Sequence, residues 1–261
     1  MALKNEQEIA LMRSAGRLLW ETHQAGREMI RSGVTTQEID RAIEDFIVSH
    51  HAEPLFKGVP GKVPFPASSC ISINEEVVHG IPSATRKLAE GDIVSIDIGL
   101  RLKGWCADAA CTYPVGDINA EKRKLLEVTE NCLRIAIQQL KEKTRWRHIA
   151  RKMQRHAEAA GFSVIEDLVG HGIGTEMWER PQVPNYFTNT LPDFHIKPGL
   201  VIAIEPMINR GGRDIRQLSD HWTIVSRDGL PSAHFEHTVA ITENGPEVLT
   251  CGPNGEGWGM P

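Results

Sequence analysis

The sequence predicts an α+β fold made of two similar halves, in which helices cover one face of a mainly antiparallel sheet. Helical and strand patterns come in blocks rather than in strict alternation. Segment 90–97, EGDIVSID, matches segment 198–205, PGLVIAIE, because each has a carboxylate six residues after its glycine. No low-complexity linker separates the halves, so we expect residues 1–261 to form one domain with an internal duplication.

The first half, about residues 1–115, begins with two helical patterns, over 5–31 and over 35–51. In the second pattern, Ile39 and Ile43 recur at the spacing that places them on one face of a helix. Apolar and β-branched runs follow, and they predict strands near 70–78, 92–99 and 106–114.

The second half, about residues 116–250, repeats this order. Helices are expected at 119–141 and 145–160, and the second of them resembles TTQEIDRAIEDFIVSHHAE of the first half. The strands expected here lie near 163–168, 200–208, 221–226 and 236–242. The last segment, 251–261, reads CGPNGEGWGMP, and its glycine and proline content predicts a mobile tail.

The composition excludes several classes of function. Of 261 residues, 41% are hydrophobic and 24% charged, as in ordinary globular proteins. The net charge of −5 provides no general attraction to nucleic acid or to an anionic membrane. No apolar run approaches the ~20 residues of a membrane span, and the N-terminus lacks a signal-peptide pattern. Five cysteines without a C-x-x-C pair indicate free thiols in a reducing environment, so we expect a cytoplasmic protein.

Carboxylates stand at unusual places in the apolar strands. Glu205 ends the run Val-Ile-Ala-Ile, and an unpaired buried charge costs several kcal/mol, so Glu205 must reach solvent or meet a cation. Asp97 and Asp108 lie in consecutive strands. If the connection is centred on Leu102 and Lys103, they face each other directly, with Cβ atoms roughly 5 Å apart. Two carboxylates that close require a proton or a cation between them.

Further polar residues join this set through the duplication. Pseudo-symmetry brings Glu205 to the same central region as Asp97. Strand alternation places His234 on the same face as Glu236, and His171 stands between two glycines that permit close approach. Each residue alone is commonly structural. Together, four carboxylates and one imidazole suit two divalent ions such as Mn, Fe, Co or Zn, about 3.5–4 Å apart.

The motifs that carry these residues resemble those of type I methionine aminopeptidases, which have the pita-bread fold. The resemblance covers about residues 5–250. Its motifs are CISINEEVVHGIP, GDIVSIDIG, CADAACTYPVG, GHGIG, PQV, KPGLVIAIEPM and FEHTVAITENG. It implies a single catalytic domain that hydrolytically removes the N-terminal methionine from nascent proteins, with a preference for a small second residue.

The resemblance also implies a role for each site residue. The ligands of two divalent metal ions (Co, Mn, Fe or Zn) would be Asp97, Asp108, His171, Glu205 and Glu236. Asp108 and Glu236 would bridge the ions, and Glu205 would also carry the proton during catalysis. His79 would contact the scissile amide. The substrate pocket would include Phe65, Cys70, Met177, Trp222 and His234.

One position departs from the family pattern. Where the family has a second substrate-contacting histidine, this chain has Trp178, in HGIGTEMWERPQV. Tryptophan offers one N–H donor and no base. It would donate to the substrate carbonyl, stack over the peptide, or narrow the pocket, so the departure affects rate and specificity more than metal binding.

Two alternative functions stay open at this level. One is a proline-directed peptidase of the same fold, and the other is a catalytically weak or inactive metal- or peptide-binding homologue. The chain contains no G-x-S-x-G, H-E-x-x-H or Walker-type motif.

The partner expectations are a monomer that acts on N-terminal Met peptides and nascent chains, without membrane contact. Segment 141–155 holds seven Lys or Arg residues and one Glu, which indicates a solvated helix face or a transient contact with ribosomal RNA. A second basic patch would comprise Arg210, Arg213 and Arg216.

Overall fold

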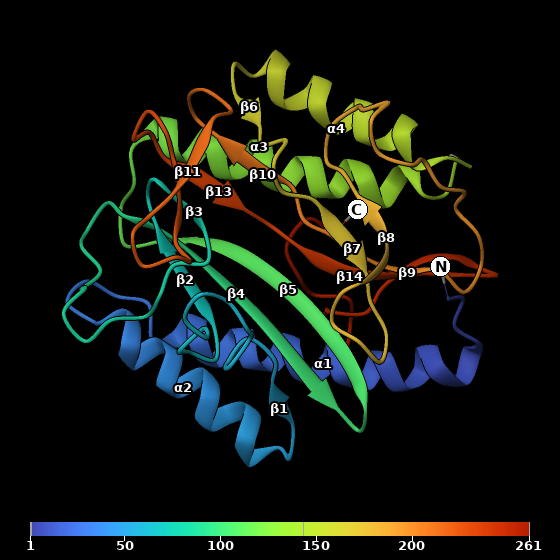
Figure 1. The fold of residues 1–261 in the computed structure, drawn as a ribbon, viewed down its shortest axis with the longest axis horizontal. Helices are drawn as coiled ribbons and strands as arrows, with labels where there is room; N and C mark the ends of the chain where they lie inside the picture. The colour runs from blue at the N-terminus through green and yellow to red at the C-terminus, as the bar shows by residue number, and fades with distance from the viewer. Residues whose placement is uncertain (1, 143, 261) are drawn as a thin grey trace.

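Four helices and four antiparallel sheets form the part of the chain that the computed structural model describes, residues 2–142 and 144–260. The helices are α1 (Glu6–Glu28), α2 (Thr36–Ser49), α3 (Ala120–Gln139) and α4 (Trp146–Ala159). α1 and α2 pack together along one side of the sheets, and α3 and α4 along the opposite side (Figure 1). These four helices confirm the helical predictions to within a few residues at each end.

Local sequence explains where three of the helices begin. Asn5 and Thr35 each cap the helix that follows and form a reciprocal capping box with Glu8 and Glu38. The Asn119 side chain accepts a hydrogen bond from the backbone of the first turn of α3. The apolar faces of both helix pairs join one core cluster with the central strands.

The first half is built around a long hairpin of β4 (Ile93–Leu102) and β5 (Trp105–Pro114). Strands β1 (Glu53–Pro54) and β2 (Cys70–Ile73) pair with β4 on its other edge. The predicted register of this hairpin is wrong. Leu102 pairs with Trp105, so the turn is centred on Lys103 and Gly104. Both turn residues have positive φ, 50° and 83°, as a tight two-residue turn that matches the strand twist requires.

The second half contains a five-stranded sheet in the order β15-β14-β9-β7-β8. Its strands are β7 (Gly170–Gly172), β8 (Glu179–Val183), β9 (Val201–Ile204), β14 (His237–Thr242) and β15 (Gly245–Val248). Two three-stranded sheets complete the fold: β13-β10-β6 and β11-β12-β3. Their strands are β3 (Glu76–Val78), β6 (Ser163–Val164), β10 (Met207–Asn209), β11 (Ile215–Gln217), β12 (Ile224–Ser226) and β13 (Ser232–His234).

Several predicted strands are shorter or divided in the structure. The predicted strand 200–208 breaks at Glu205 and Pro206 into β9 and β10, which belong to different sheets. Proline has no N–H to donate to a ladder, and this break turns the Glu205 side chain out of the sheet. The predicted strand 70–78 likewise divides into β2 and β3, and 163–168 shrinks to β6.

The last residues are packed, although their composition predicts a mobile tail. Trp258 is 8% exposed and stacks on His237 with ring centroids 4.8 Å apart. The backbone of Gly259 donates to Glu130, and Arg134 donates to the carbonyl of Met260. One buried aromatic side chain therefore anchors a segment whose glycine and proline content predicts mobility. Pro261 lies outside the described residues.

Within residues 2–142 and 144–260, none of the helices combines the length and the apolar character that crossing a bilayer would require. All five cysteines are free thiols, and four of them are buried.

Candidate metal centre

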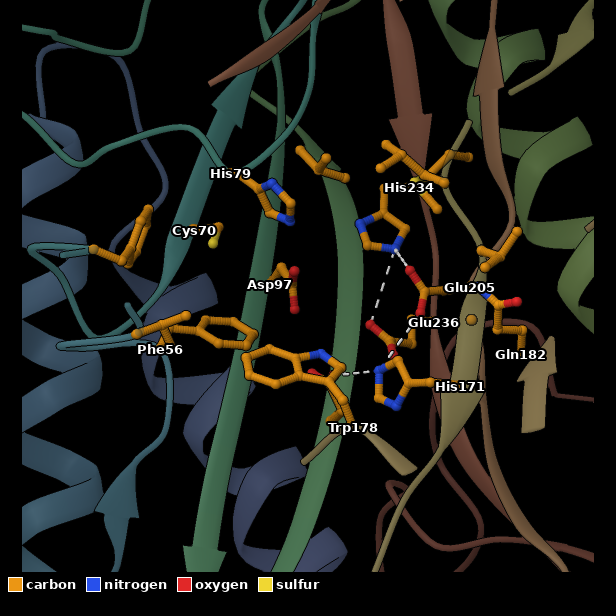
Figure 2. Close-up of a pocket in the computed structure, with 18 of the residues that line it drawn as sticks. Phe56, Cys70, His79, Asp97, His171, Trp178, Gln182, Glu205, His234 and Glu236 are labelled. Carbon is orange, nitrogen blue, oxygen red and sulfur yellow. Dashed lines mark ion pairs between the residues drawn. The ribbon is translucent and has the colours of Figure 1, made fainter. Parts of the chain in front are cut away.

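A cavity of about 540 Å³ lies between the two halves. Strands β4 and β5 form one wall, and the ends of β7, β9 and β14 form the facing wall (Figure 2). The lining combines carboxylates and histidines at one end with apolar side chains at the other. Such a cavity can hold a charged reacting group and an apolar side chain at the same time.

All five predicted ligands line this cavity: Asp97, Asp108, His171, Glu205 and Glu236. His171 Nε2 lies 3.4 Å from Asp108 Oδ2 and 3.7 Å from Glu205 Oε1. Asp108, His171 and Glu236 each offer a donor atom, and these atoms lie within 4.8 Å of one another. This spacing suits a shared divalent cation.

The corrected hairpin register still brings Asp97 and Asp108 to one face. Asp97 pairs with Ala110, and Asp108 pairs with Gly99 two positions along. The two aspartates are therefore diagonal neighbours on the same side of the sheet, at a distance that carboxylates can span. Figure 2 shows Asp97 entering the cavity opposite the group formed by His171, Glu205 and Glu236.

Hydrogen bonds hold the main chain of the carboxylate residues in place. The Thr238 hydroxyl donates to the Asp108 carbonyl at 2.8 Å and accepts from the Asp108 N–H at 3.0 Å. Asn185 Nδ2 donates to the Glu205 carbonyl at 2.9 Å. The Glu236 N–H donates to the Ala110 carbonyl at 2.8 Å, which ties the second half to strand β5.

Burial makes this collection of acids unfavourable without a cation. It raises the pKa of Asp97 and Glu236 well above the ordinary value, with further contributions from neighbouring carboxylates. It also raises the pKa of Glu205 to about 8. Burial lowers the pKa of His171, but the Asp108 and Glu205 carboxylates outweigh it and raise that pKa to about 9. One imidazolium cannot balance four carboxylates, so the site favours added positive charge.

Two further histidines lie in the same cavity. His79 has a φ of 58°, a left-handed conformation that is uncommon for a residue other than glycine and frequent at functional sites. Its imidazole points into the cavity, and burial lowers its pKa to about 4 (Figure 2). His234 Nε2 lies 3.9 Å from Glu236 and 4.0 Å from Glu205, and burial lowers its pKa to about 3. Both rings are neutral at physiological pH.

The apolar end contains three of the four apolar side chains predicted for the pocket. Phe65 and Trp222 meet edge to face with ring centroids 5.2 Å apart, and Cys70 is buried beside them. Met177, the fourth apolar residue predicted for the pocket, belongs to the same apolar cluster as these three. This buried side chain does not line the cavity but packs behind it against Phe56, where Gly99 leaves room for both.

Sequence reasoning missed several lining residues, among them Phe56, Val59, Leu168, Gln182 and Met207. Met207 follows Glu205 by two positions in the quoted motif, so alternation offered a signal for it. Phe56 lies in an irregular loop after β1 and carries no comparable pattern.

Trp178 lies at the mouth of the cavity and is 55% exposed. Its ring meets the His171 ring at an angle of 67°, with centroids 6.5 Å apart. Figure 2 shows the indole between Phe56 and His171. The next residue, Glu179, is fixed by an ion pair at 2.5 Å with Lys4, which is almost completely buried. Trp178 thus directly precedes strand β8, next to a residue that an ion pair holds in place, and more than half of its surface is exposed.

This combination of fold and site is that of a metallopeptidase. Residues 10–243 match the model of metallopeptidase family M24, and the chain belongs to that family. It is 48% identical over 248 residues to a methionine aminopeptidase of Clostridium perfringens, covering 95% of this chain and 98% of that one. It is 47% identical to methionine aminopeptidase 1 of Bacillus subtilis over the same length and coverage.

Solved structures agree with these sequence relatives. The chain superposes on the crystal structure of a methionine aminopeptidase from Thermotoga maritima with a TM-score of 0.91, at 38% identity, covering 96% of this chain and 99% of that one. The predicted pita-bread fold and the resemblance to type I methionine aminopeptidases are therefore confirmed.

Proposed function

We propose that this chain is a methionine aminopeptidase that uses divalent metal to hydrolyse the peptide bond after an N-terminal methionine. The observation that carries the proposal is the convergence of five ligand-type side chains at one end of a cavity whose other end is apolar. The relatives named above point to the same activity.

The residues present fit two divalent ions. In the part of the chain that the structure describes, the buried oxygens Asp97 Oδ1, Asp108 Oδ1 and Glu236 Oε1 have no hydrogen-bond partner. Such groups are costly unless a cation satisfies them. Asp97, Asp108, His171, Glu205 and Glu236 would hold the ions. Oxygen donors with one imidazole suit Mn, Fe, Co or Zn. The ions would polarise the scissile carbonyl and lower the pKa of water.

The chain's own side chains perform the remaining steps. Water adds to the scissile carbonyl carbon, the C–N bond breaks, and one proton must reach the leaving amine. Glu205 would accept that proton at its carboxylate and return it to the leaving amine, because it lines the same cavity and a carboxylate within hydrogen-bond reach can act as a general base. His79 is neutral and donates an N–H to the developing oxyanion.

The apolar end selects the side chain that is removed. Phe65, Cys70 and Trp222 offer an aromatic and polarisable lining, which favours a flexible thioether over a charged group. The Trp222 indole N–H is engaged with the Val63 carbonyl at 2.7 Å, so the ring is held in place as a wall. A small second residue would be preferred because the bulky rings of Trp178 and Phe56 lie side by side next to the metal centre (Figure 2).

A peptide-release assay tests this proposal. Release of methionine from Met-Ala-Ser is measured with Mn²⁺, Co²⁺, Fe²⁺ or Zn²⁺ for the wild type, for Asp108→Asn, and for Glu243→Gln as a control at an exposed carboxylate. We expect metal-dependent release by the wild type and the control only. Metal-loaded protein that binds the peptide without cleaving it would instead support the inactive homologue, and preferential cleavage before proline would support the proline-directed peptidase.

We further propose that the protein acts as a cytoplasmic monomer on emerging chains. The basic segment supports a ribosomal contact only weakly, because Arg145 and Arg147 pair with Asp193. In the second patch, Arg210 pairs with Glu121 and Arg213 with Glu166. Lys143, within the basic segment, lies outside the described residues. Ribosome co-sedimentation that charge reversal in these patches leaves unchanged would contradict a ribosomal contact.

A further inference from the structure

The residues beyond the family match make a second contact network behind the metal centre. The family model ends at residue 243, whereas the buried Trp258 lies 15 positions later. Its indole Nε1 donates to the backbone carbonyl of Glu236 at 2.8 Å. Since the Glu236 N–H is held by the Ala110 carbonyl, both sides of this ligand's main chain are fixed.

The same segment reaches Asp108 through a chain of hydrogen bonds. The Trp258 carbonyl can only accept, so His237 Nε2, at 2.7 Å, carries the proton. His237 Nδ1 then accepts from the Thr250 hydroxyl at 2.8 Å, and that hydroxyl accepts from the Thr238 N–H at 3.1 Å. The Thr238 hydroxyl in turn holds the Asp108 backbone.

Ring packing and surface contacts secure the segment itself. The Trp258 ring lies nearly parallel to His237, with an interplanar angle of 10°, and meets the His23 ring edge to face at 4.8 Å. From α3, Glu130 accepts from the Gly259 N–H at 2.8 Å, and Arg134 donates to the Met260 carbonyl at 3.0 Å. None of these residues lines the metal cavity.

We propose that Trp258 is a positioning residue for the metal centre. The C-terminal clamp, residues 256–260, fixes the main chain of Glu236 directly and that of Asp108 through His237, Thr250 and Thr238. Residues that orient metal ligands from behind commonly influence metal affinity by about 10–100-fold. This inference rests on the proposed function, in which Asp108 and Glu236 are ligands shared by both ions.

Trp258→Phe tests the proposal, because phenylalanine keeps a ring against His237 but removes the N–H donor to Glu236. The Mn²⁺ dissociation constant is measured by calorimetry, and the visible absorption of the Co²⁺-loaded protein reports the ligand geometry. We expect the dissociation constant to rise about 10-fold, the Co²⁺ spectrum to change, and activity to recover at high Mn²⁺. Ile149→Ala, in α4, is the control: it weakens the core and should lower the melting temperature without changing either metal readout.

The results distinguish the two proposals. If Trp258→Phe binds Mn²⁺ as tightly as the wild type does, the positioning role is overturned but the proposed function is not affected. A wild type that binds no divalent metal would overturn both. If Trp258→Phe does not fold, the double variant Glu130→Ala/Arg134→Ala loosens the clamp from the surface. It should weaken Mn²⁺ binding in the same direction by a smaller factor, and unchanged binding would overturn the inference.

Discussion

Replacing Trp178 by alanine should weaken substrate binding and leave the chemical step almost unchanged. The indole lines the cavity and is 55% exposed, and its ring centroid is 6.5 Å from that of His171. A peptide that extends from the metal centre out of the cavity would pass this exposed side chain. We therefore expect the ring to stack on the residues after the scissile bond, rather than to donate to the reacting carbonyl.

The exposed area of the ring sets the size of this effect. A tryptophan side chain presents about 250 Å² and Trp178 is 55% exposed, so about 140 Å² is available to a ligand. If a peptide covers half of that area, about 70 Å² is removed from water. At ~25 cal/mol per Å² the contribution is about 1.7 kcal/mol, or roughly a 20-fold change in affinity.

Steady-state kinetics on Met-Ala-Ser at saturating Mn²⁺ measure this change. We expect Trp178→Ala to raise KM about 20-fold while kcat stays within about 3-fold, and Trp178→Phe to keep both values close to the wild type. Trp178→His, which introduces the histidine that the sequence resemblance predicts at this position, should resemble the alanine variant in KM. A fall in kcat of about 100-fold in Trp178→Phe, with KM unchanged, would refute the stacking interpretation and show that the indole N–H contacts the reacting carbonyl.

Three further predictions concern stability. Mn²⁺ at about 100 times its dissociation constant should stabilise the wild type by about 2.7 kcal/mol per ion in a thermal melt, and this shift should disappear on chelation or in Asp108→Asn. Burial lowers the pKa of His23 to about 4. Between about pH 6.5 and pH 4 the unfolded chain therefore binds a proton at this residue and the folded chain does not, so the free energy of unfolding falls as the pH falls. In metal-free protein, the wild type should lose about 2 kcal/mol more than His23→Gln between pH 7 and pH 5 in urea titrations; equal losses would contradict this. A methyl group on Gly16 would lie 2.3 Å from the Leu249 carbonyl oxygen, so Gly16→Ala should cost about 1–3 kcal/mol, whereas Ser14→Ala at an exposed position should not.

Local signals in the sequence account for the parts of the fold that could be predicted. Asn5 and Thr35 predict the first residues of two helices because their side chains cap the backbone that follows, and the apolar periodicity after them identifies the buried faces. Glu205 was a candidate ligand because a carboxylate that ends an apolar strand requires a partner, and the structure places it 3.7 Å from His171. These signals depend on neighbours along the chain.

The features that sequence could not determine depend on contacts between distant segments. The observed hairpin register differs from the predicted one because Lys103 adopts a left-handed conformation beside Gly104. A lysine at this turn position gives no signal in the sequence, and only one of the two turn residues is a glycine. Met177 is an apolar, flexible side chain of the kind that lines a pocket. Its side chain packs against Gly99, which has no side chain of its own, and so lies behind the cavity wall. In the tail, Trp258 finds its partners on α3 and β14, which no local pattern encodes.

The way the site is built explains why its ligands tolerate burial. Thr238 and Asn185 donate hydrogen bonds to the main chains of Asp108 and Glu205, and the Glu236 N–H donates to the Ala110 carbonyl. Folding therefore positions these side chains before any cation binds. Burial raises the pKa of all three carboxyl groups, and neighbouring carboxylates add to that rise at Glu205 and Glu236. Rigid placement prevents these groups from moving apart or into solvent to relieve the cost. The unfavourable free energy of the metal-free site then becomes affinity for divalent ions, because a cation relieves the repulsion and the desolvation of these groups at once. A more mobile main chain would lower both the repulsion and the metal affinity. Trp258 therefore influences metal binding, although it does not contact the ions, because it holds the main chain of Glu236 in place.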